Sequence, residues 1–347
     1  MAEQPHTIQA FESLGAFLSA FCKSEKTNDL DAFESLDRTI ALAGQRNGWF
    51  TRDNILFALE QWSQVLTKQQ LSKWVANYSF TTSHPKSVAI IMAGNIPLVG
   101  FHDFLSVLLS GNKAICKLSS NDTVLLPFLA NLLSNYEPSL VGQIEFVKGK
   151  LECYDAVIAT GSNNTSRYFE YYFGNKPNII RKNRTSVAVL TGDETADQLK
   201  LLGIDVFKYY GLGCRNVSKL FVPRDYNFDA FFNAMYSYQD IIEHHKYANN
   251  YDYNKAVYLM SDFKILDNGF MILKEDSSMH SPISVLYYEH YDSIEELEKL
   301  LKEQQEYIQC VVSQIGIGNE VAFGQTQRPK LDDYADGVDT LQFLITL

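Results

Sequence analysis

The sequence of 347 residues predicts an α/β protein built on parallel sheets. Two observations lead to this fold class. Short continuous apolar runs, such as Val88–Met92 and Ala156–Ala159, are typical of strands that are buried on both faces. These runs end at turn-forming residues, and helix-like apolar stretches stand between them. Strands that alternate with helices in this way form parallel sheets with crossover helices.

The expected elements follow in order along the chain. Residues 7–78 are expected to be helical, because apolar residues recur at helical spacing: Phe11, Leu14, Leu18 and Phe21, then Ile55, Leu59, Trp62 and Leu66. A first α/β unit is expected to have strands over 88–92, 113–118, 144–147 and 156–159, and helices over 104–109 and 123–135. A second unit is expected to have strands over 186–190, 219–222 and 284–288, a helix over 228–242, and a helix opened by a Ser293–Glu296 capping box.

The composition is that of an ordinary globular protein, with 46% hydrophobic and 20% charged residues. Two domains are expected, because a single hydrophobic core rarely serves a chain of this length. The formal net charge of -11 argues against a nucleic-acid partner, whose phosphates need a basic surface.

The cysteines and the apolar runs indicate a cytoplasmic protein. The five cysteines are scattered and odd in number, without a CxxC pair. This usage suits a reducing compartment and argues against a disulfide framework and a cysteine-ligated zinc site, so no metal site is expected. No apolar run approaches the length of a membrane span, and no signal peptide is apparent in the first residues.

Cys214 is the candidate nucleophile. Gly211 and Gly213 precede it and allow the backbone to approach a ligand closely. Arg215 beside it would favour a thiolate, the nucleophilic form of cysteine. Since a cysteine is more often a small buried apolar residue, the assignment of Cys214 depends on whether other motifs supply an oxyanion donor and a cofactor site.

Asn95 follows the strand at 88–92, and its side-chain amide could donate to a developing oxyanion. An asparagine in a turn can equally be structural. Lys117 ends the strand at 113–118, and the hydroxyls of Ser119 and Ser120 stand beyond it. Such a group can hold a nucleotide ribose or its phosphate, although a surface lysine is the commoner role.

Gly161 and Ser162 lie between a predicted strand and a predicted helix. At such a junction the backbone N–H groups and the helix dipole suit a pyrophosphate. A plain strand-to-helix turn explains these two residues as well.

Taken in order, these motifs resemble the aldehyde dehydrogenase superfamily over roughly residues 85–310. Ala-Gly-Asn-Ile-Pro-Leu at 93–98 is similar to its Asn-aromatic-Pro turn, and residues 109–120 are similar to its Gly-Asn…Lys-Pro-Ser strand. Residues 159–162 are similar to its Thr-Gly-Ser turn, residues 211–214 to its Gly-Gln-x-Cys loop, and residues 280–285 to its Phe-Gly-Pro-Val segment. Because the order is the family's, the joint match is more specific than any one motif.

Within the superfamily, the chain looks most like the fatty acyl-CoA reductase branch, which makes aldehyde for bacterial bioluminescence. The turn at 94–97 and residues 117–122 carry this likeness. The resemblance implies an aldehyde dehydrogenase-like fold with a Rossmann-type cofactor domain and an α/β catalytic domain. N-terminal helices and the nucleotide-binding domain would occupy 1–182, the catalytic domain 183–310, and a segment over 311–347 would pack back on the protein.

The resemblance also implies a role for each candidate. Cys214 would accept the acyl group, and the Asn95 amide with the Cys214 backbone N–H would form the oxyanion hole. Gly161 and Ser162 would lie against the cofactor pyrophosphate, and Lys117 would reach the adenosine ribose with Ser119 and Ser120 beside it.

One departure from the family pattern concerns the general base that activates water. Ordinary aldehyde dehydrogenases carry a glutamate general base in a Glu-Leu-Gly-Gly-Lys segment, and the corresponding stretch 180–185 has no carboxylate. Without a base to activate water, an acyl-enzyme would survive long enough to accept hydride or exchange with a thiol. Asp193, Glu194 and Glu243 remain open as substitutes for that base.

Two further departures concern the cofactor. Ser120 stands where NAD-dependent members often have a glutamate that would repel a 2′-phosphate, so NADPH is expected and NADH stays open. Ser278 takes the place of the family glutamate that holds the nicotinamide ribose, which leaves that contact open.

The sequence therefore predicts an enzyme that reduces an acyl-CoA, or an acyl-protein thioester, to aldehyde with NADPH through an S-acyl-cysteine. The alternatives are an aldehyde dehydrogenase that forms acid or acyl-CoA, a reductase of acyl phosphates, and a catalytically silent nucleotide-binding relative. The aromatic segment Phe228–Tyr238 would line an acyl tunnel or form core. A homo-oligomer also stays open.

Overall fold

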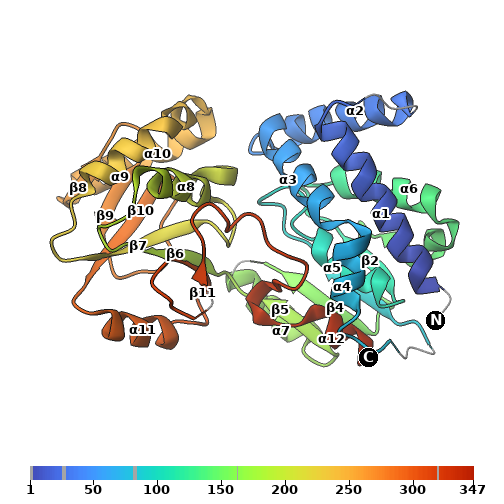
Figure 1. Ribbon diagram of the computed structural model, residues 1–347. Coiled ribbons are helices and arrows are strands. Elements are labelled where there is room, and N and C mark those ends of the chain that lie inside the picture. The colour runs from blue at the N-terminus through green and yellow to red at the C-terminus, as the bar shows by residue number, and fades with distance from the viewer. Residues whose placement is uncertain (1–2, 26–28, 81–83, 162, 319) are drawn as a thin grey trace. The chain divides into compact units, whose positions relative to one another are not determined.

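The computed structural model describes residues 3–25, 29–80, 84–161, 163–318 and 320–347. The chain divides into two compact units, each with its own sheet (Figure 1). Unit 1 comprises Met1–Lys182 and Lys330–Leu347, and unit 2 comprises Asn183–Pro329. Residues 311–329 therefore fold with unit 2, and only the chain from Lys330 onward returns to unit 1.

Unit 1 is built on a parallel sheet in the order β3-β2-β1-β4-β5. Its strands are β1 Ser87–Ile91, β2 Lys113–Lys117, β3 Ile144–Phe146, β4 Ala156–Thr160 and β5 Asn178–Arg181. Val88, Ala89 and Ile90 of β1 have no exposed surface, as expected for a strand covered on both faces. The strand order reverses between β1 and β4, which is where ligands bind in open α/β sheets.

Helices cover both faces of this sheet. They are α1 Glu3–Cys22, α2 Leu30–Arg46, α3 Arg52–Val65, α4 Lys68–Val75, α5 Phe101–Leu109, α6 Leu125–Tyr136, α7 Asn163–Phe173 and α12 Thr340–Ile345, with 3₁₀ turns η1 Pro138–Gln143 and η4 Ala335–Gly337. The larger core joins α1, α3, α5 and α6 to one face of the sheet through side chains such as Val88 and Ile90. On the other face, Phe169 and Phe173 of α7 pack against Ala89 and Val157.

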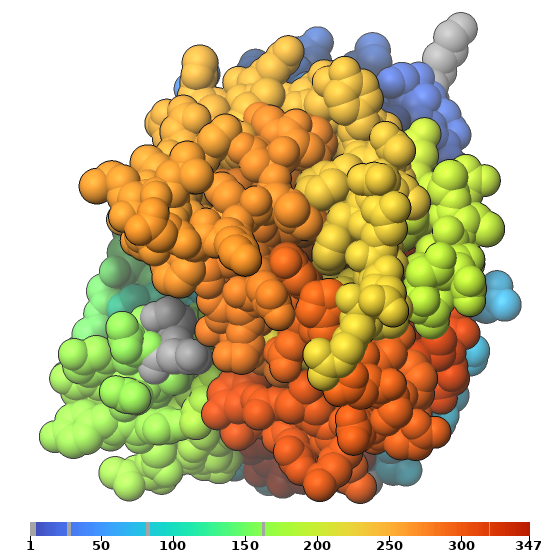
Figure 2. All heavy atoms as spheres, turned by 90° about the vertical axis from the view of Figure 1, so that its left-hand side faces the viewer, coloured from blue at the N-terminus to red at the C-terminus, as the bar shows by residue number. Residues whose placement is uncertain are grey.

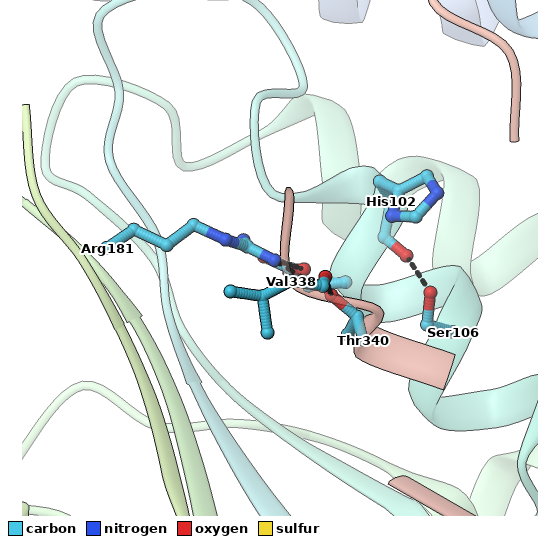
Figure 3. A network of polar contacts seen from close by, with 6 residues as sticks. His102, Ser106, Arg181, Val338 and Thr340 are labelled. Carbon is cyan, nitrogen blue, oxygen red and sulfur yellow. Dashed lines mark hydrogen bonds and ion pairs between the residues drawn. The ribbon is translucent and has the colours of Figure 1, made fainter. Parts of the chain in front are cut away.

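The returning C-terminal segment is tied to unit 1 by a buried polar cluster (Figure 3). The Nη2 atom of Arg181 donates to Asp103 Oδ1 at 2.7 Å and to Thr340 Oγ1 at 3.0 Å. Figure 3 shows the Arg181 side chain extended toward Thr340, with His102 and Ser106 on the neighbouring helix. Since Arg181 is the last residue of β5, this cluster fixes the returning segment close to where the chain leaves unit 1.

Unit 2 is built on a second sheet, in the order β12-β11-β6-β7-β10-β9-β8. Its strands are β6 Thr185–Val189, β7 Val217–Pro223, β8 Ile265–Asp267, β9 Ile272–Glu275, β10 Val285–Tyr291, β11 Ile308–Val312 and β12 Glu320–Val321. Strand β8 pairs antiparallel with β9, and the other pairings in this sheet are parallel.

The helices of unit 2 are α8 Ala196–Phe207, α9 Phe228–Met235, α10 His245–Met260 and α11 Ile294–Glu303, with 3₁₀ turns η2 Lys208–Gly211 and η3 Tyr236–Glu243. The helix expected over 228–242 thus changes to 3₁₀ after Met235, where the Ser237 hydroxyl donates back to Ala234 O. The face of unit 2 seen in Figure 2 is formed largely by yellow and orange segments, from α9 onward.

Helix caps were only partly predicted. Ser293 accepts the N–H of Glu296 at the start of α11, which is one half of the expected capping box. The complete box lies at α8, where Thr195 and Gln198 satisfy each other's backbone N–H groups. No described helix is both long enough and apolar enough to cross a membrane.

Candidate active site

Cys214 lies in unit 2, partly exposed, in the turn between η2 and β7. The buried side chain of Asn216 holds this turn. Its Oδ1 atom accepts the Gly213 N–H at 2.8 Å, and its Nδ2 atom donates to Asp205 O at 3.0 Å. Ser186 of β6 donates its hydroxyl to Cys214 O at 3.2 Å. The backbone on both sides of the thiol is therefore fixed to the end of α8 and to the central strands.

The backbone just before Cys214 is strained. Tyr209, Tyr210 and Gly211 have φ values of 54°, 59° and 76°, which lie in the left-handed region. Glycine adopts it freely, whereas a tyrosine there costs about 1–2 kcal/mol. Packing holds the strain, because Tyr209 is buried and the Tyr210 ring stacks on His244 with centroids 4.2 Å apart. Strain of this kind gathers at functional sites.

Arg215 turns toward another segment of unit 2. Its Nε atom donates to Thr326 O at 2.6 Å. The buried carboxyl of Asp205 binds the same segment, accepting the N–H groups of Gly324 at 2.6 Å and Thr326 at 3.0 Å. Burial raises the pKa of Asp205 to about 6, and these hydrogen bonds offset part of the rise. Residues 324–326 are thus hydrogen-bonded to Asp205, which precedes the Cys214 turn, and to Arg215, which follows Cys214.

The space behind the turn is small. A cavity of about 30 Å³ is lined by Tyr210, Gly211, Tyr247 and residues 281–286, among others. It has room for water but not for an acyl chain. The aromatic segment Phe228–Tyr238 does not enlarge it, because Phe231 and Met235 are fully buried core residues. The core role expected for this segment is observed for Phe231 and Met235, whereas Tyr236 is exposed.

Asn95 lies in unit 1, in the turn that follows β1, and is partly exposed. The turn is anchored at each end: Gly94 O accepts from Asn47 Nδ2 at 3.3 Å, and the Leu98 N–H donates to Asp122 Oδ2 at 3.1 Å. Gly94 also has no room for a side chain, because a Cβ there would come within 2.6 Å of Ser119 Oγ.

The expected nucleotide-binding residues follow β2 and β4. Lys117 Nζ donates to Gly149 O at 2.9 Å, Ser119 is partly exposed and Ser120 is exposed. Gly161 directly follows β4, and Ser162 lies outside the described residues. Strands β1, β2 and β4 are parallel neighbours, so the residues after them share one edge of the sheet with Asn95. The structure thus brings Asn95, Lys117 and Gly161 to the same edge.

The carboxylates considered as substitutes for the family's general base are all in unit 2. Glu194 accepts the N–H groups of Thr191 at 2.6 Å and Gly192 at 3.1 Å, and so caps the turn after β6. Asp193 and Glu243 are exposed. Among the described residues, no three His, Cys, Asp or Glu side chains gather as a metal site would require.

Three residues that hold the candidate turns were missed by sequence reasoning: Asn47, Asp122 and Asn216. Asn216 stands next to Arg215, but nothing in its neighbourhood marks it as the anchor of the Cys214 turn. Asp122 lies within residues 117–122, but its role is not visible in the sequence because its partner Leu98 lies in a different βα turn.

Solved aldehyde dehydrogenases share this fold. Aldehyde dehydrogenase 21 from Physcomitrella patens, in complex with the reaction product succinate, is 12% identical, with 99% of this chain and 86% of that chain covered and a TM-score of 0.66. An NAD-dependent aldehyde dehydrogenase from Sinorhizobium meliloti is 15% identical, with 94% and 73% covered and a TM-score of 0.66. One from Mycobacterium tuberculosis, complexed with NAD+, is 14% identical, with 87% and 72% covered and a TM-score of 0.59.

The fold is therefore that of the aldehyde dehydrogenases, as the motifs predicted. Residues 16–315 match the family described as acyl-CoA reductase (LuxC). The chain belongs to this family and is an oxidoreductase that reduces a fatty acyl group to aldehyde. The resemblance to the fatty acyl-CoA reductase branch is thus confirmed. A search of curated proteins finds no match.

Proposed function

We propose that the protein reduces an acyl-CoA to aldehyde with NADPH, through a covalent S-acyl intermediate on Cys214. The placement of the thiol is the observation that supports this most. Cys214 is partly exposed on a turn whose backbone is held by Asn216 and Ser186 and preceded by strained tyrosines. A structural cysteine needs no such support, whereas a nucleophile must be held still and open to its substrate.

In this mechanism the Cys214 thiolate attacks the thioester carbonyl, the carbon–sulfur bond to CoA breaks, and CoA leaves as its thiolate. Lys117, Ser119, Ser120 and Gly161 would hold the nicotinamide nucleotide, which would supply the hydride that the carbonyl carbon of the acyl-enzyme accepts. The thiohemiacetal oxyanion that hydride addition leaves on Cys214 then collapses, releases aldehyde and regenerates the Cys214 thiolate. Thiolate attack and hydride addition each place negative charge on the acyl oxygen, so that oxygen needs hydrogen-bond donors.

The Asn95 side-chain amide and the Cys214 backbone N–H are the proposed donors. An amide donor preorganised toward an oxyanion lowers the barrier by about 3–4 kcal/mol. The anchored turn that carries Asn95 supports this role, because a donor that must be ordered during the reaction contributes less.

The cofactor residues fit a dinucleotide by chemistry and by position. Lys117 offers a cation, Ser119 and Ser120 offer hydroxyls, and Gly161 precedes the N-terminus of α7, all at the edge where the strand order reverses. Ser162 is proposed beside Gly161 on the motif alone. The Mycobacterium tuberculosis relative was solved with NAD+, which supports a nicotinamide nucleotide. NADPH is proposed because Ser120 is exposed and brings no negative charge to a 2′-phosphate.

The fate of the acyl group follows from the missing base. In the stretch where the family has its glutamate, Arg181 is paired with Asp103 within unit 1. Glu194 is engaged in a turn, and this supports reduction in place of hydrolysis. In this scheme residues 1–182 bind nucleotide and 183–310 carry the nucleophile. An acyl-protein thioester would react in the same way as acyl-CoA. The scheme is compatible with a homo-oligomer. The scattered cysteines suit a protein that works in the cytoplasm.

A product assay tests the proposal. Purified protein is mixed with acyl-CoAs of several lengths and with NADPH or NADH, and released CoA and aldehyde are measured. We expect Cys214→Ala to lose both products, while Cys153→Ala, which alters an exposed cysteine of unit 1, keeps them. Aldehyde formation by Cys214→Ala at the parent rate contradicts the mechanism. Conversion of aldehyde and NADP+ to free acid without CoA contradicts the argument from the missing base.

A further inference from the structure

The turn after β1 is held by side chains that come from two other parts of unit 1, the end of α2 and the loop after β2. Asn47 caps the end of α2, is 6% exposed, and donates from Nδ2 to Gly94 O. Its Oδ1 atom accepts the Trp49 N–H at 3.1 Å, so both ends of the amide are engaged. Asp122, 8% exposed, accepts the Leu98 N–H, and the Ser119 side chain fills the space beside Gly94.

The turn would not keep this shape by itself. Leu98 has a φ of 58°, a left-handed conformation that costs a non-glycine residue about 1–2 kcal/mol. The hydrogen bond from its N–H to the Asp122 carboxylate involves a charged acceptor, and such bonds are about twice as strong as neutral ones. This bond therefore offsets the strain at Leu98 and fixes the direction in which the chain leaves Asn95.

Asp122 is itself in an unfavourable position. Its surroundings are apolar: Met92, Phe101, Leu118 and Leu126 share a cavity of about 10 Å³ with it. Arg46, at the end of α2, donates to the neighbouring Thr123 hydroxyl. Burial raises the pKa of Asp122 to about 6, and the N–H groups of Leu98 and Leu125 offset part of the rise. Because burying a carboxyl in apolar surroundings is unfavourable, its presence here indicates that Asp122 has a role besides packing.

We propose that Asp122 and Asn47 are positioning residues that clamp the Gly94–Leu98 turn and thereby aim the Asn95 amide at the acyl oxygen. This inference rests on the proposed oxyanion role of Asn95. Neither residue touches the substrate. They act by restricting the backbone on either side of Asn95, and displacing a reacting group by about 1 Å can lower a rate by 10²-fold.

The test measures acylation of Cys214 alone, as the burst of CoA released from acyl-CoA without NADPH. Asp122→Ala is expected to slow the burst by roughly ten- to a hundredfold with little change in the acyl-CoA concentration for half-saturation. Asp122→Asn keeps a carbonyl oxygen for the Leu98 N–H and is expected to stay within about threefold of the parent. Asn47→Ala is expected to slow the burst in the same direction as Asp122→Ala. Asp332→Ala, which removes an exposed carboxylate, is the matched control.

A double-mutant cycle separates positioning from general structural damage. In an Asn95→Ala background, Asp122→Ala is expected to add less than about threefold, because the group it aims is gone. An equal effect in both backgrounds, or no effect in the parent, overturns the clamp and leaves the mechanism standing. If Asn95→Ala leaves the burst at the parent rate, the oxyanion assignment fails and the clamp fails with it. If Asp122→Ala does not fold, Asn47→Ala enters the cycle in its place and is judged by the same outcomes.

Discussion

The carboxyl of Asp122 accepts the backbone N–H of Leu98 at 3.1 Å. This contact joins the segment after β2 to the turn after β1, within the edge of the sheet where Lys117 and Gly161 also lie. The proposed oxyanion donor and the proposed cofactor residues are therefore carried by adjoining loops of one rigid sheet. A disturbance of either loop is expected to affect both acylation and hydride transfer.

The anchor of the nucleophile turn gives a first prediction. Asn216→Ala removes the acceptor for Gly213 and the donor to Asp205, both in a buried site. We expect the CoA burst to slow by at least tenfold and the free energy of unfolding to fall by about 2–3 kcal/mol. Burst kinetics and urea denaturation measure these two effects. Asn249→Ala, on the exposed side of α10, should change neither; a parent-like burst in Asn216→Ala contradicts the role given to this residue.

Cofactor choice gives a second prediction. Ser120→Glu places a carboxylate where NADPH would carry its 2′-phosphate, and like charges repel. The kcat/KM for NADPH is expected to fall by roughly tenfold or more, while that for NADH falls little or rises. Steady-state assays with each cofactor provide the ratio, and Ser139→Glu, at an exposed position of η1, serves as the control. An unchanged ratio would mean that Ser120 does not face the adenosine ribose.

The pH dependence of stability gives a third prediction. The pKa of Asp205 is raised from 3.8 to about 6 by burial, so the folded protein binds a proton there that the unfolded chain has released. The stability contributed by protonated Asp205 is complete below about pH 4 and is lost as the pH rises through 6. This loss amounts to about 3 kcal/mol, at 1.4 kcal/mol per pH unit.

Asp205→Asn cannot release this proton. Relative to the parent, the free energy of unfolding of the variant should therefore increase between pH 4 and pH 7. Denaturation at several pH values gives the difference, which cancels the contributions of other groups such as Asp122. A difference that stays constant with pH shows that Asp205 does not titrate in this range.

The buried ion pair gives a fourth prediction. Arg181 and Asp103 have side chains that are 8% and 3% exposed. Arg181→Met leaves the Asp103 carboxylate buried without its guanidinium partner. We expect the free energy of unfolding of unit 1 to fall by about 3–5 kcal/mol. In the double variant Arg181→Met/Asp103→Leu most of the loss should return, because no charge is then buried. Chemical denaturation compares the two, and equal losses would mean that the charge pair is not what the site requires.

Much of the fold follows from local patterns. The continuous apolar runs at 88–92 and 156–159 became β1 and β4, and the strand expected over 113–118 became β2 with its buried residues between Lys113 and Lys117, because burial on both faces admits few polar residues. The sequence contains the capping box of α8 as Thr195 and Gln198, but a capping box was predicted only at the similar Ser293–Glu296 pattern. Such motifs report that a helix begins but not which bonds form.

The site was less predictable, for a physical reason. Tyrosine disfavours the left-handed region, so no local rule places Tyr209 and Tyr210 there; packing against His244 and the core imposes it. The contacts of Asn47 with Gly94 and of Asp122 with Leu98 join residues far apart in the chain. The assignments of Cys214, Asn95 and the cofactor residues came from motif order, and they remain predictions.

Intact-mass spectrometry of the acyl-enzyme tests the central claim most directly. The parent protein, Cys214→Ala and Cys153→Ala are each incubated with acyl-CoA without NADPH, and their intact masses are then measured. We predict that the parent and Cys153→Ala gain the mass of one acyl group and lose it when NADPH is added, while Cys214→Ala gains none. An acyl adduct on Cys214→Ala, or a parent that makes aldehyde without ever carrying the acyl group, contradicts Cys214 as the residue that receives it.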